Sequence, residues 1–185
     1  AQTRLSAEPY HHPHFLRPPA AMQYRFISLW SGAGIADAAA MRAGSIPTFA
    51  AEISKDDASL YQRNFGVTPH QSNEKLLTEL KGLSGFLPQL HMGFECTSVA
   101  QNGKKEGLSH SSWGDFDRAI EGIRDLMPMS IMWENVPGLL EDKECWGKVR
   151  KSFKDLGYTM VHGVTDPKDF GIGVSRPRLI GLCLK

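Results

Sequence analysis

A short apolar run that leads through a glycine-rich turn into an alanine-rich stretch constrains this fold more than any other feature of the sequence. Residues 26–30 predict a strand, residues 31–34 a tight turn and residues 35–43 a helix. Two glycines, Gly32 and Gly34, allow the backbone to approach a ligand closely, and the helix that follows offers free N–H groups. A strand, a turn and a helix in this order are typical of an α/β protein.

The same alternation of strands and helices continues along the chain. Further strands are predicted at residues 46–51, 90–94, 131–133, 158–164 and 179–184, and further helices at residues 55–65, near 73–80, at 116–127 and at 149–156. This order predicts a Rossmann-like α/β fold, with a mostly parallel sheet that has helices on both faces. We expect one domain at residues 22–185, preceded at residues 1–21 by a proline-rich irregular arm or leader.

The composition limits the classes of function. The 185 residues, of which 41% are hydrophobic, suffice for one core. The net charge of +1 predicts no strongly basic surface, so positive charge for nucleic acid must be local or come from a partner. Cys96, Cys145 and Cys183 form no CxxC pair, which argues against a zinc site or a disulfide framework and favours a reducing cytoplasm. No apolar run approaches the roughly 20 residues that cross a bilayer.

A carboxylate follows the glycine-rich turn at a spacing typical of nucleoside binding. Glu52 lies 18 residues after Gly34, at the end of the second predicted strand. A carboxylate there can accept hydrogen bonds from both hydroxyls of a ribose. The third glycine of the dinucleotide fingerprint is missing, since Ala36 or Asp37 stands in that region. The spacing alone does not separate a dinucleotide from S-adenosylmethionine.

Three further segments carry side chains suited to chemistry. Cys96 follows a predicted strand and opens a polar loop, where a thiol can meet a substrate, although a free cysteine can equally be a small buried residue. Glu134 ends a strand at the edge where α/β proteins bind ligands, or it caps a helix. Arg176 and Arg178 point to one face of an extended backbone, where they suit a phosphate or a carbonyl oxygen, or form a solvated basic strand.

Taken in this order, these segments resemble the DNA cytosine-5 methyltransferase family. The motifs of that family match, along the chain, residues 30–34, Glu52, residues 93–97, residues 134–136 and residues 176–178. The Glu-Asn-Val motif is intact, and the Gly-Phe-Glu-Cys-Thr segment is similar to the Gly-Phe-Pro-Cys-Gln motif of the nucleophile. The resemblance covers roughly residues 26–184 and identifies residues 22–185 as a methyltransferase catalytic domain.

The resemblance implies transfer of a methyl group from S-adenosylmethionine to carbon 5 of a cytosine flipped out of duplex DNA. Cys96 would attack position 6 of the ring, because the resulting enamine-like ring lets carbon 5 accept the methyl group. Glu134 would hydrogen-bond N3 and the amino group of the base. Arg178, with Arg176 as its companion, would hold the ring oxygen O2.

The resemblance also implies where the cofactor binds, and it requires no metal. Trp30 would lie against the adenine, and Glu52 would bind the ribose. The expected cofactor-binding residues are Trp30, Ser31, Gly32, Ala33, Gly34, Ile35, Glu52, Ile53, Asn73 and Phe94.

The sequence also departs from the family pattern. Glu95 replaces the proline before the nucleophile, and a carboxylate there disfavours the thiolate. The remaining departures are Thr97 and Val174 in place of glutamines, and Ser28 and Asn73 in place of acidic residues. No segment resembles the target recognition domain of the family, so we expect that a second subunit or an appended domain carries target recognition, or that the protein is a truncated or minimal member of the family.

Three other hypotheses remain open. The chain could be a catalytically weak or inactive binding or regulatory protein with the same fold, a methyltransferase for another pyrimidine substrate such as RNA, or a nicotinamide-dependent dehydrogenase. The dehydrogenase hypothesis gives Cys96 and Glu134 no role. The presence of Cys96, Glu134 and Arg178 together favours catalysis over a binding role.

Overall fold

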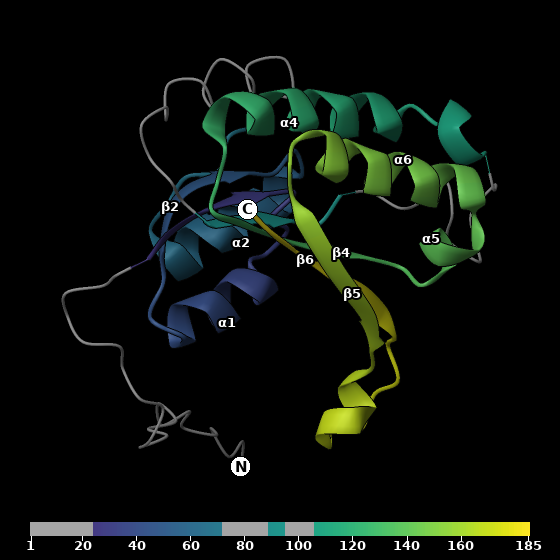
Figure 1. The fold of residues 1–185 in the computed structure, drawn as a ribbon. Helices are drawn as coiled ribbons and strands as arrows, with labels where there is room; N and C mark the ends of the chain where they lie inside the picture. Colours follow the sequence, from purple (N-terminus) through teal and green to yellow (C-terminus); the bar gives the residue numbers. More distant parts are fainter. Residues whose placement is uncertain (1–23, 72–88, 95–105) are drawn as a thin grey trace, which may run out of the picture.

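The computed structural model describes residues 24–71, 89–94 and 106–185, in which six strands form one sheet with helices on both faces (Figure 1). The expected arm at 1–21, the helix expected near 73–80, and the predicted site residues Asn73 and Cys96 lie outside the described residues. The sheet has the order β2-β1-β3-β4-β6-β5. Its strands are β1 (Arg25–Leu29), β2 (Ile46–Ala51), β3 (Gln89–Met92), β4 (Ser130–Asn135), β5 (Thr159–Thr165) and β6 (Arg178–Leu184).

The sheet is mostly parallel, which confirms the predicted fold class. Strands β2, β1, β3 and β4 run parallel, whereas β6 runs antiparallel to both of its neighbours, β4 and β5. Because β6 is reversed, its first residues lie beside the last residues of β4, with Leu179 opposite Asn135 and Ile180 opposite Glu134. The start of β6 therefore contributes to the same sheet edge as the carboxyl ends of the parallel strands.

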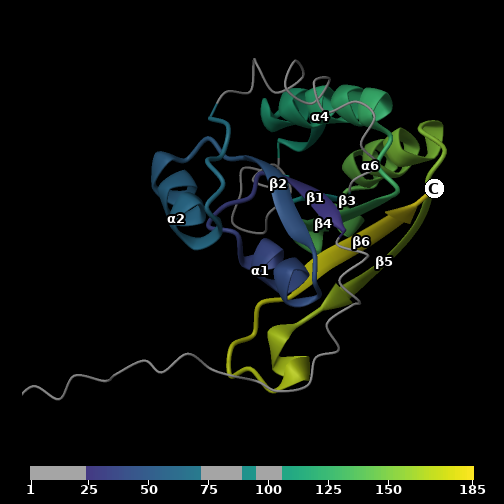
Figure 2. The same cartoon turned by 90° about the vertical axis from the view of Figure 1, so that its left-hand side faces the viewer.

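Two pairs of helices cover opposite faces of the sheet (Figures 1 and 2). Helices α1 (Ile35–Arg42) and α2 (Lys55–Phe65) lie on one face, and α4 (Ser112–Leu126) and α6 (Lys143–Asp155) lie on the other. Ser54 and Asp142 cap α2 and α6 by accepting backbone N–H hydrogen bonds. The sequence predicted these four helices, although α4 and α6 begin four and six residues earlier than the apolar spacing alone indicated. The remaining helices, α5 (Gly138–Glu141), η1 (Gly107–Ser109) and η2 (Pro167–Phe170), are too short to show a period.

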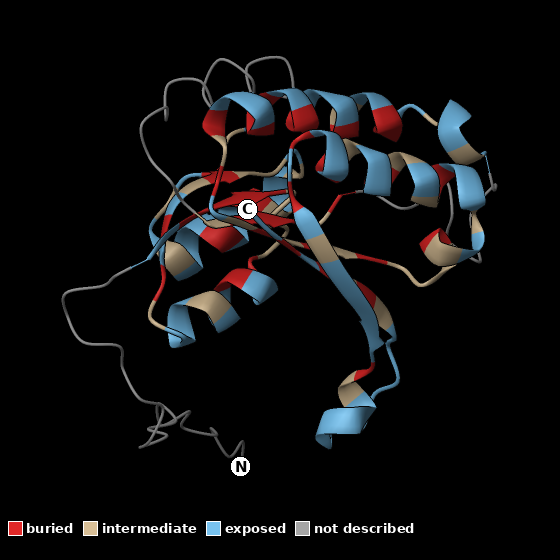
Figure 3. Ribbon diagram, viewed as in Figure 1, coloured by how far each residue is buried: buried red, intermediate tan, exposed pale blue. Residues whose placement is uncertain are grey.

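The main core lies between the sheet and the α4–α6 layer (Figure 3). Phe116 and Ile123 on α4 and Phe153 on α6 are fully buried there, as the helical spacing of α4 predicted. Trp133 of β4 lies over Gly181 of β6, where an added Cβ would come within 2.0 Å of the indole ring. Among the described residues, no helix is long and apolar enough to span a membrane.

Candidate active site

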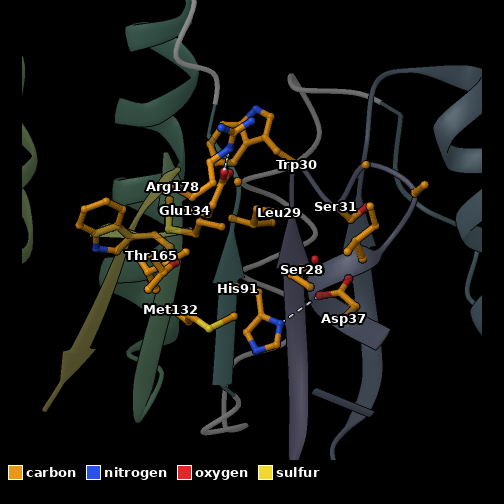
Figure 4. Close-up of a pocket in the computed structure, with 18 of the residues that line it drawn as sticks. Ser28, Leu29, Trp30, Ser31, Asp37, His91, Met132, Glu134, Thr165 and Arg178 are labelled. Carbon is orange, nitrogen blue, oxygen red and sulfur yellow. Dashed lines mark hydrogen bonds and ion pairs between the residues drawn. The ribbon is translucent and has the colours of Figure 1, made fainter. Parts of the chain in front are cut away.

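A cavity of about 690 Å³ opens at the carboxyl ends of β1, β3 and β4 and at the start of β6 (Figure 4). This is the edge at which open α/β sheets bind their ligands. The predicted residues among those that line the cavity are Trp30, Ser31, Gly32, Ala33, Ile35, Glu134, Arg176 and Arg178. Gly34, Glu52, Ile53 and Phe94 were also predicted to bind the cofactor, and they lie outside the described lining.

The glycine-rich turn is shaped by two positive φ angles with different consequences. Gly34 has φ of 87°, and a Cβ there would lie 2.1 Å from the Phe65 ring, so only glycine lets the turn pack against α2. Gly32 has φ of 52°, and a Cβ there would meet nothing within 4 Å. The turn is therefore packed on its α2 side and open at Gly32, where its backbone faces the cavity.

Glu52 holds this turn in place. Its Oε2 accepts a hydrogen bond from the Gly32 N–H at 2.8 Å, and its Oε1 accepts one from the Ser54 N–H at 2.8 Å. Each carboxylate oxygen has two lone pairs, so each can accept a further donor. Glu52 thus links the glycine-rich turn to the start of α2, a structural role that the sequence did not predict.

Glu134 and Arg178, predicted separately from two segments, meet at the rim of the cavity. Arg178 Nε donates to Glu134 Oε1 at 2.6 Å, and the two side chains are 25% and 43% exposed (Figure 4). A second guanidinium N–H donates to the carbonyl oxygen of Pro177 at 2.9 Å. An ion pair this exposed contributes at most about 1 kcal/mol to folding. Its effect is to hold a carboxylate and a guanidinium side by side, where both can reach a bound molecule.

The connection between β5 and β6, which carries Arg176, is anchored by Asp166. Asp166 accepts hydrogen bonds from the Ser175 hydroxyl at 2.7 Å and from the backbone N–H groups of Arg176 at 3.0 Å and Lys168 at 3.2 Å. Partial burial raises the pKa of Asp166, but these hydrogen bonds outweigh it and lower that pKa to about 2. The anchor is lost only as the pH falls through this low value. Sequence reasoning missed Asp166, although an aspartate before Pro167 is a typical capping signal.

The amino-acid sequence of this chain matches the profile of a known protein family. The profile of the C-5 cytosine-specific DNA methylases matches residues 24–185. The chain belongs to this DNA methylase family. The match covers every described element, from β1 to β6.

Individual methylases show the same similarity. The Type II methyltransferase M.MspI of Moraxella sp is 31% identical over 162 residues, which are 84% of this chain and 37% of that protein. M.HhaI of Haemophilus parahaemolyticus is 26% identical over 87% of this chain and 49% of its own length. The chain therefore spans half or less of the length of these two relatives.

Solved structures show the same fold. The S. pombe Dnmt2 methyltransferase superposes with a TM-score of 0.72 at 23% identity, over 88% of this chain and 51% of that one. The Entamoeba histolytica methyltransferase EhMeth gives a TM-score of 0.70 at 19% identity, over 88% of this chain and 53% of that one. At these identities the likeness shows the fold alone.

In this methylase domain, Asn135 joins the end of β4 to the end of the segment that follows β3. Its side chain is 1% exposed; Nδ2 donates to the Phe94 carbonyl oxygen at 3.1 Å, and Oδ1 accepts from the Val136 N–H at 2.9 Å. The Phe94 ring packs in the core, 5.0 Å from the Phe116 ring. Asn135 and Phe94 thus fix the chain two residues before Cys96.

We expect Asn135→Ala to lower the free energy of unfolding by about 1–3 kcal/mol, because it leaves the buried Phe94 carbonyl and Val136 N–H without partners. Urea denaturation measures this change. Asn64→Ala, at an exposed position of α2, is the matched control and should change stability by less than about 0.5 kcal/mol. Equal effects of the two substitutions would contradict the anchoring role of Asn135.

Proposed function

We propose that this chain carries the methyl-transfer site of a DNA cytosine-5 methyltransferase. The Glu134–Arg178 pair at the rim of the cavity, opposite the glycine-rich turn, is the observation that carries the proposal. A carboxylate and a guanidinium held 2.6 Å apart match one edge of a cytosine ring that is protonated at N3. Glu134 accepts hydrogen bonds from the amino group and from the N3–H of the protonated ring, and Arg178 donates to O2, with Arg176 beside it.

The proposed cofactor is S-adenosylmethionine, which supplies the methyl group. The open backbone at Gly32 and the Trp30 side chain lie at the cavity, and both suit a nucleoside. Glu52 uses one lone pair of each carboxylate oxygen on the turn and keeps others for ribose hydroxyls. The described residues at the turn therefore fit this cofactor.

Cys96 is the proposed nucleophile, and the other two cysteines are poorly suited to that role. Cys145 and Cys183 are fully buried. Burial, and then the charge of Asp142, raises the pKa of Cys145 to about 12. Burial raises the pKa of Cys183 to about 11. Both remain protonated at neutral pH, where a nucleophile must be a thiolate.

We expect Glu52→Ala to weaken binding of S-adenosylhomocysteine by about 1–3 kcal/mol, because it removes charged hydrogen bonds to the ribose. Isothermal titration calorimetry measures the affinity. Since Glu52 also holds the turn, the thermal unfolding of the variant is followed alongside. Glu121→Ala, an exposed change on α4, is the control, and unchanged affinity of Glu52→Ala would remove Glu52 from the cofactor site.

Transfer of labelled methyl groups to duplex DNA tests the function. RNA of the same sequence serves as the competing substrate, and duplex DNA with cytosine replaced by 5-methylcytosine serves as the blank. We propose that target recognition uses polypeptide beyond these 185 residues, in a longer chain or in a second subunit, because the net charge is only +1 and the relatives are longer. The assay is therefore run with and without a candidate partner chain. No transfer to DNA under either condition contradicts the proposal.

A further inference from the structure

Trp113, in the first turn of α4, contacts the chain both before and after the segment that carries Cys96. On the side before Cys96, the centroid of its ring lies 6.4 Å from that of Phe94. On the side after Cys96, its indole Nε1–H donates to the carbonyl oxygen of Gly107 at 2.9 Å. A single side chain thus joins the two positions that flank the segment of the proposed nucleophile.

The ring of Trp113 is itself held in the core. Its side chain is 5% exposed and meets the Phe116 ring edge-on, with 5.4 Å between the two centroids. The Phe94 ring in turn lies 6.0 Å from Trp133, which precedes Glu134 on β4. Aromatic pairs at these spacings pack with defined relative orientations. The contacts of Trp113 therefore continue to the strand that carries Glu134.

Gly107 meets Trp113 in a backbone conformation that favours glycine. Its φ is +54°, and a Cβ added there would lie 3.5 Å from Asp142 Oδ2, which is an ordinary contact. Because Asp142 caps α6, Gly107 lies between the start of α4 and the start of α6. The Gly107 carbonyl also accepts a longer bond, of 3.4 Å, from the His110 N–H. Loss of the indole N–H would therefore leave this carbonyl with a partner, but it would release the carbonyl from the core.

We propose that Trp113 is a positioning residue for methyl transfer, which joins Phe94 to Gly107 and so sets where Cys96 is presented to the base. Trp113 lines no part of the described cavity, so it acts through the chain and touches neither base nor cofactor. Misplacement of a reacting group by about 1 Å slows a reaction by up to about 100-fold. This inference rests on the proposed function, in which Cys96 attacks the ring.

Two substitutions test the contact from its opposite sides. Trp113→Phe keeps an aromatic ring beside Phe94 but removes the N–H that donates to Gly107. Gly107→Ala keeps the indole but shifts the backbone, since a residue with a Cβ rarely adopts a φ of +54°. Each should lower the single-turnover rate at saturating DNA by about 10-fold or more, while the affinity for S-adenosylhomocysteine changes by less than about 2-fold.

Matched controls separate positioning from a loss of stability. Phe153→Leu alters another fully buried ring that packs on Phe116, and Gly147→Ala adds a Cβ to an exposed glycine of α6 that has nothing within 4 Å. Rates are compared at a temperature where thermal unfolding curves show every variant folded. Both controls should then keep the wild-type rate within about 2-fold.

The outcomes distinguish this inference from the proposed function. A wild-type rate in Trp113→Phe overturns the inference and, should that variant not fold, a wild-type rate in Gly107→Ala does so. An equal loss of rate in Phe153→Leu also overturns it. These results leave the proposed function intact, because the wild-type chain still transfers methyl groups. No transfer by the wild-type chain, alone or with a partner chain, overturns the proposed function and this inference with it.

Discussion

Cys96→Ser is expected to abolish the covalent complex that the wild-type chain forms with duplex DNA containing 5-fluorocytosine. Cys96 attacks position 6, and carbon 5 then takes the methyl group from S-adenosylmethionine. Fluorine now occupies the place of the hydrogen that elimination removes from carbon 5, so the thiol is not released and the protein stays attached to the base. A serine hydroxyl without an adjacent base is a weak nucleophile at neutral pH. Adduct formation should fall by at least about 10³-fold, the scale on which loss of a covalent nucleophile acts.

Denaturing electrophoresis of labelled DNA measures this adduct. Cys145→Ala and Cys183→Ala are the matched controls, because both thiols are buried and protonated at neutral pH, and both variants should keep the adduct. If wild-type protein needs a partner chain to bind DNA, all three variants are assayed with that partner. An adduct that survives in Cys96→Ser would show that another group attacks the base.

Glu134→Gln is expected to slow methyl transfer by about 10²- to 10⁴-fold, the contribution of a positioned acid or base. The amide keeps the size of the side chain but loses the charge that both Arg178 and the activated ring require. Because the Glu134–Arg178 pair is partly exposed, the free energy of unfolding should change by less than about 1 kcal/mol. A large loss of activity without a loss of stability is therefore the signature of the proposed role.

A second ion pair supplies the control for this variant. Lys148 Nζ and Asp117 Oδ1 lie 2.7 Å apart, join α6 to α4, and line no part of the described cavity. Asp117→Asn should leave transfer unchanged within about 2-fold while removing a comparable surface ion pair. Rates are measured under single-turnover conditions, so that the chemical step is observed. Equal rates for Glu134→Gln and the wild-type chain would exclude Glu134 from catalysis.

The sequence predicted the elements of the fold because each has a local signal. The alternating strands and helices, the glycine-rich turn and the ends of α1 and α2 follow from periodicity and from glycine at positive φ. The antiparallel direction of β6 has no local signal, since a strand reads the same in either direction. For that reason the contact between Glu134 and Arg178 could not be predicted, although each residue was predicted to belong to the site.

The residues that support the site were harder to predict than those that line it. Asn135 acts through a hydrogen bond to the Phe94 carbonyl 41 positions away, which no spacing reveals. Asp166 carries a local capping signal, but its hydrogen bond to the Arg176 N–H, ten positions on, depends on how the connection folds back. Asp37 was noted only because it stands near the missing third glycine of a nucleotide motif. Its pairing with His91 links residues 54 positions apart, and a buried carboxylate on a helix breaks the apolar pattern that sequence reasoning relies on.

The packing of Trp133 on Gly181 makes the geometry of the site depend on the register of β4 and β6 in the core. If β6 shifted by one residue against β4, a side chain would replace the hydrogen of Gly181 beneath the indole, and the same shift would turn Arg178 to the other face of the sheet. The collision with the indole therefore disfavours the shifted register, in which Glu134 and Arg178 would not meet. A single glycine, 48 residues downstream of the tryptophan, thus fixes the register of the two strands that carry Glu134 and Arg178.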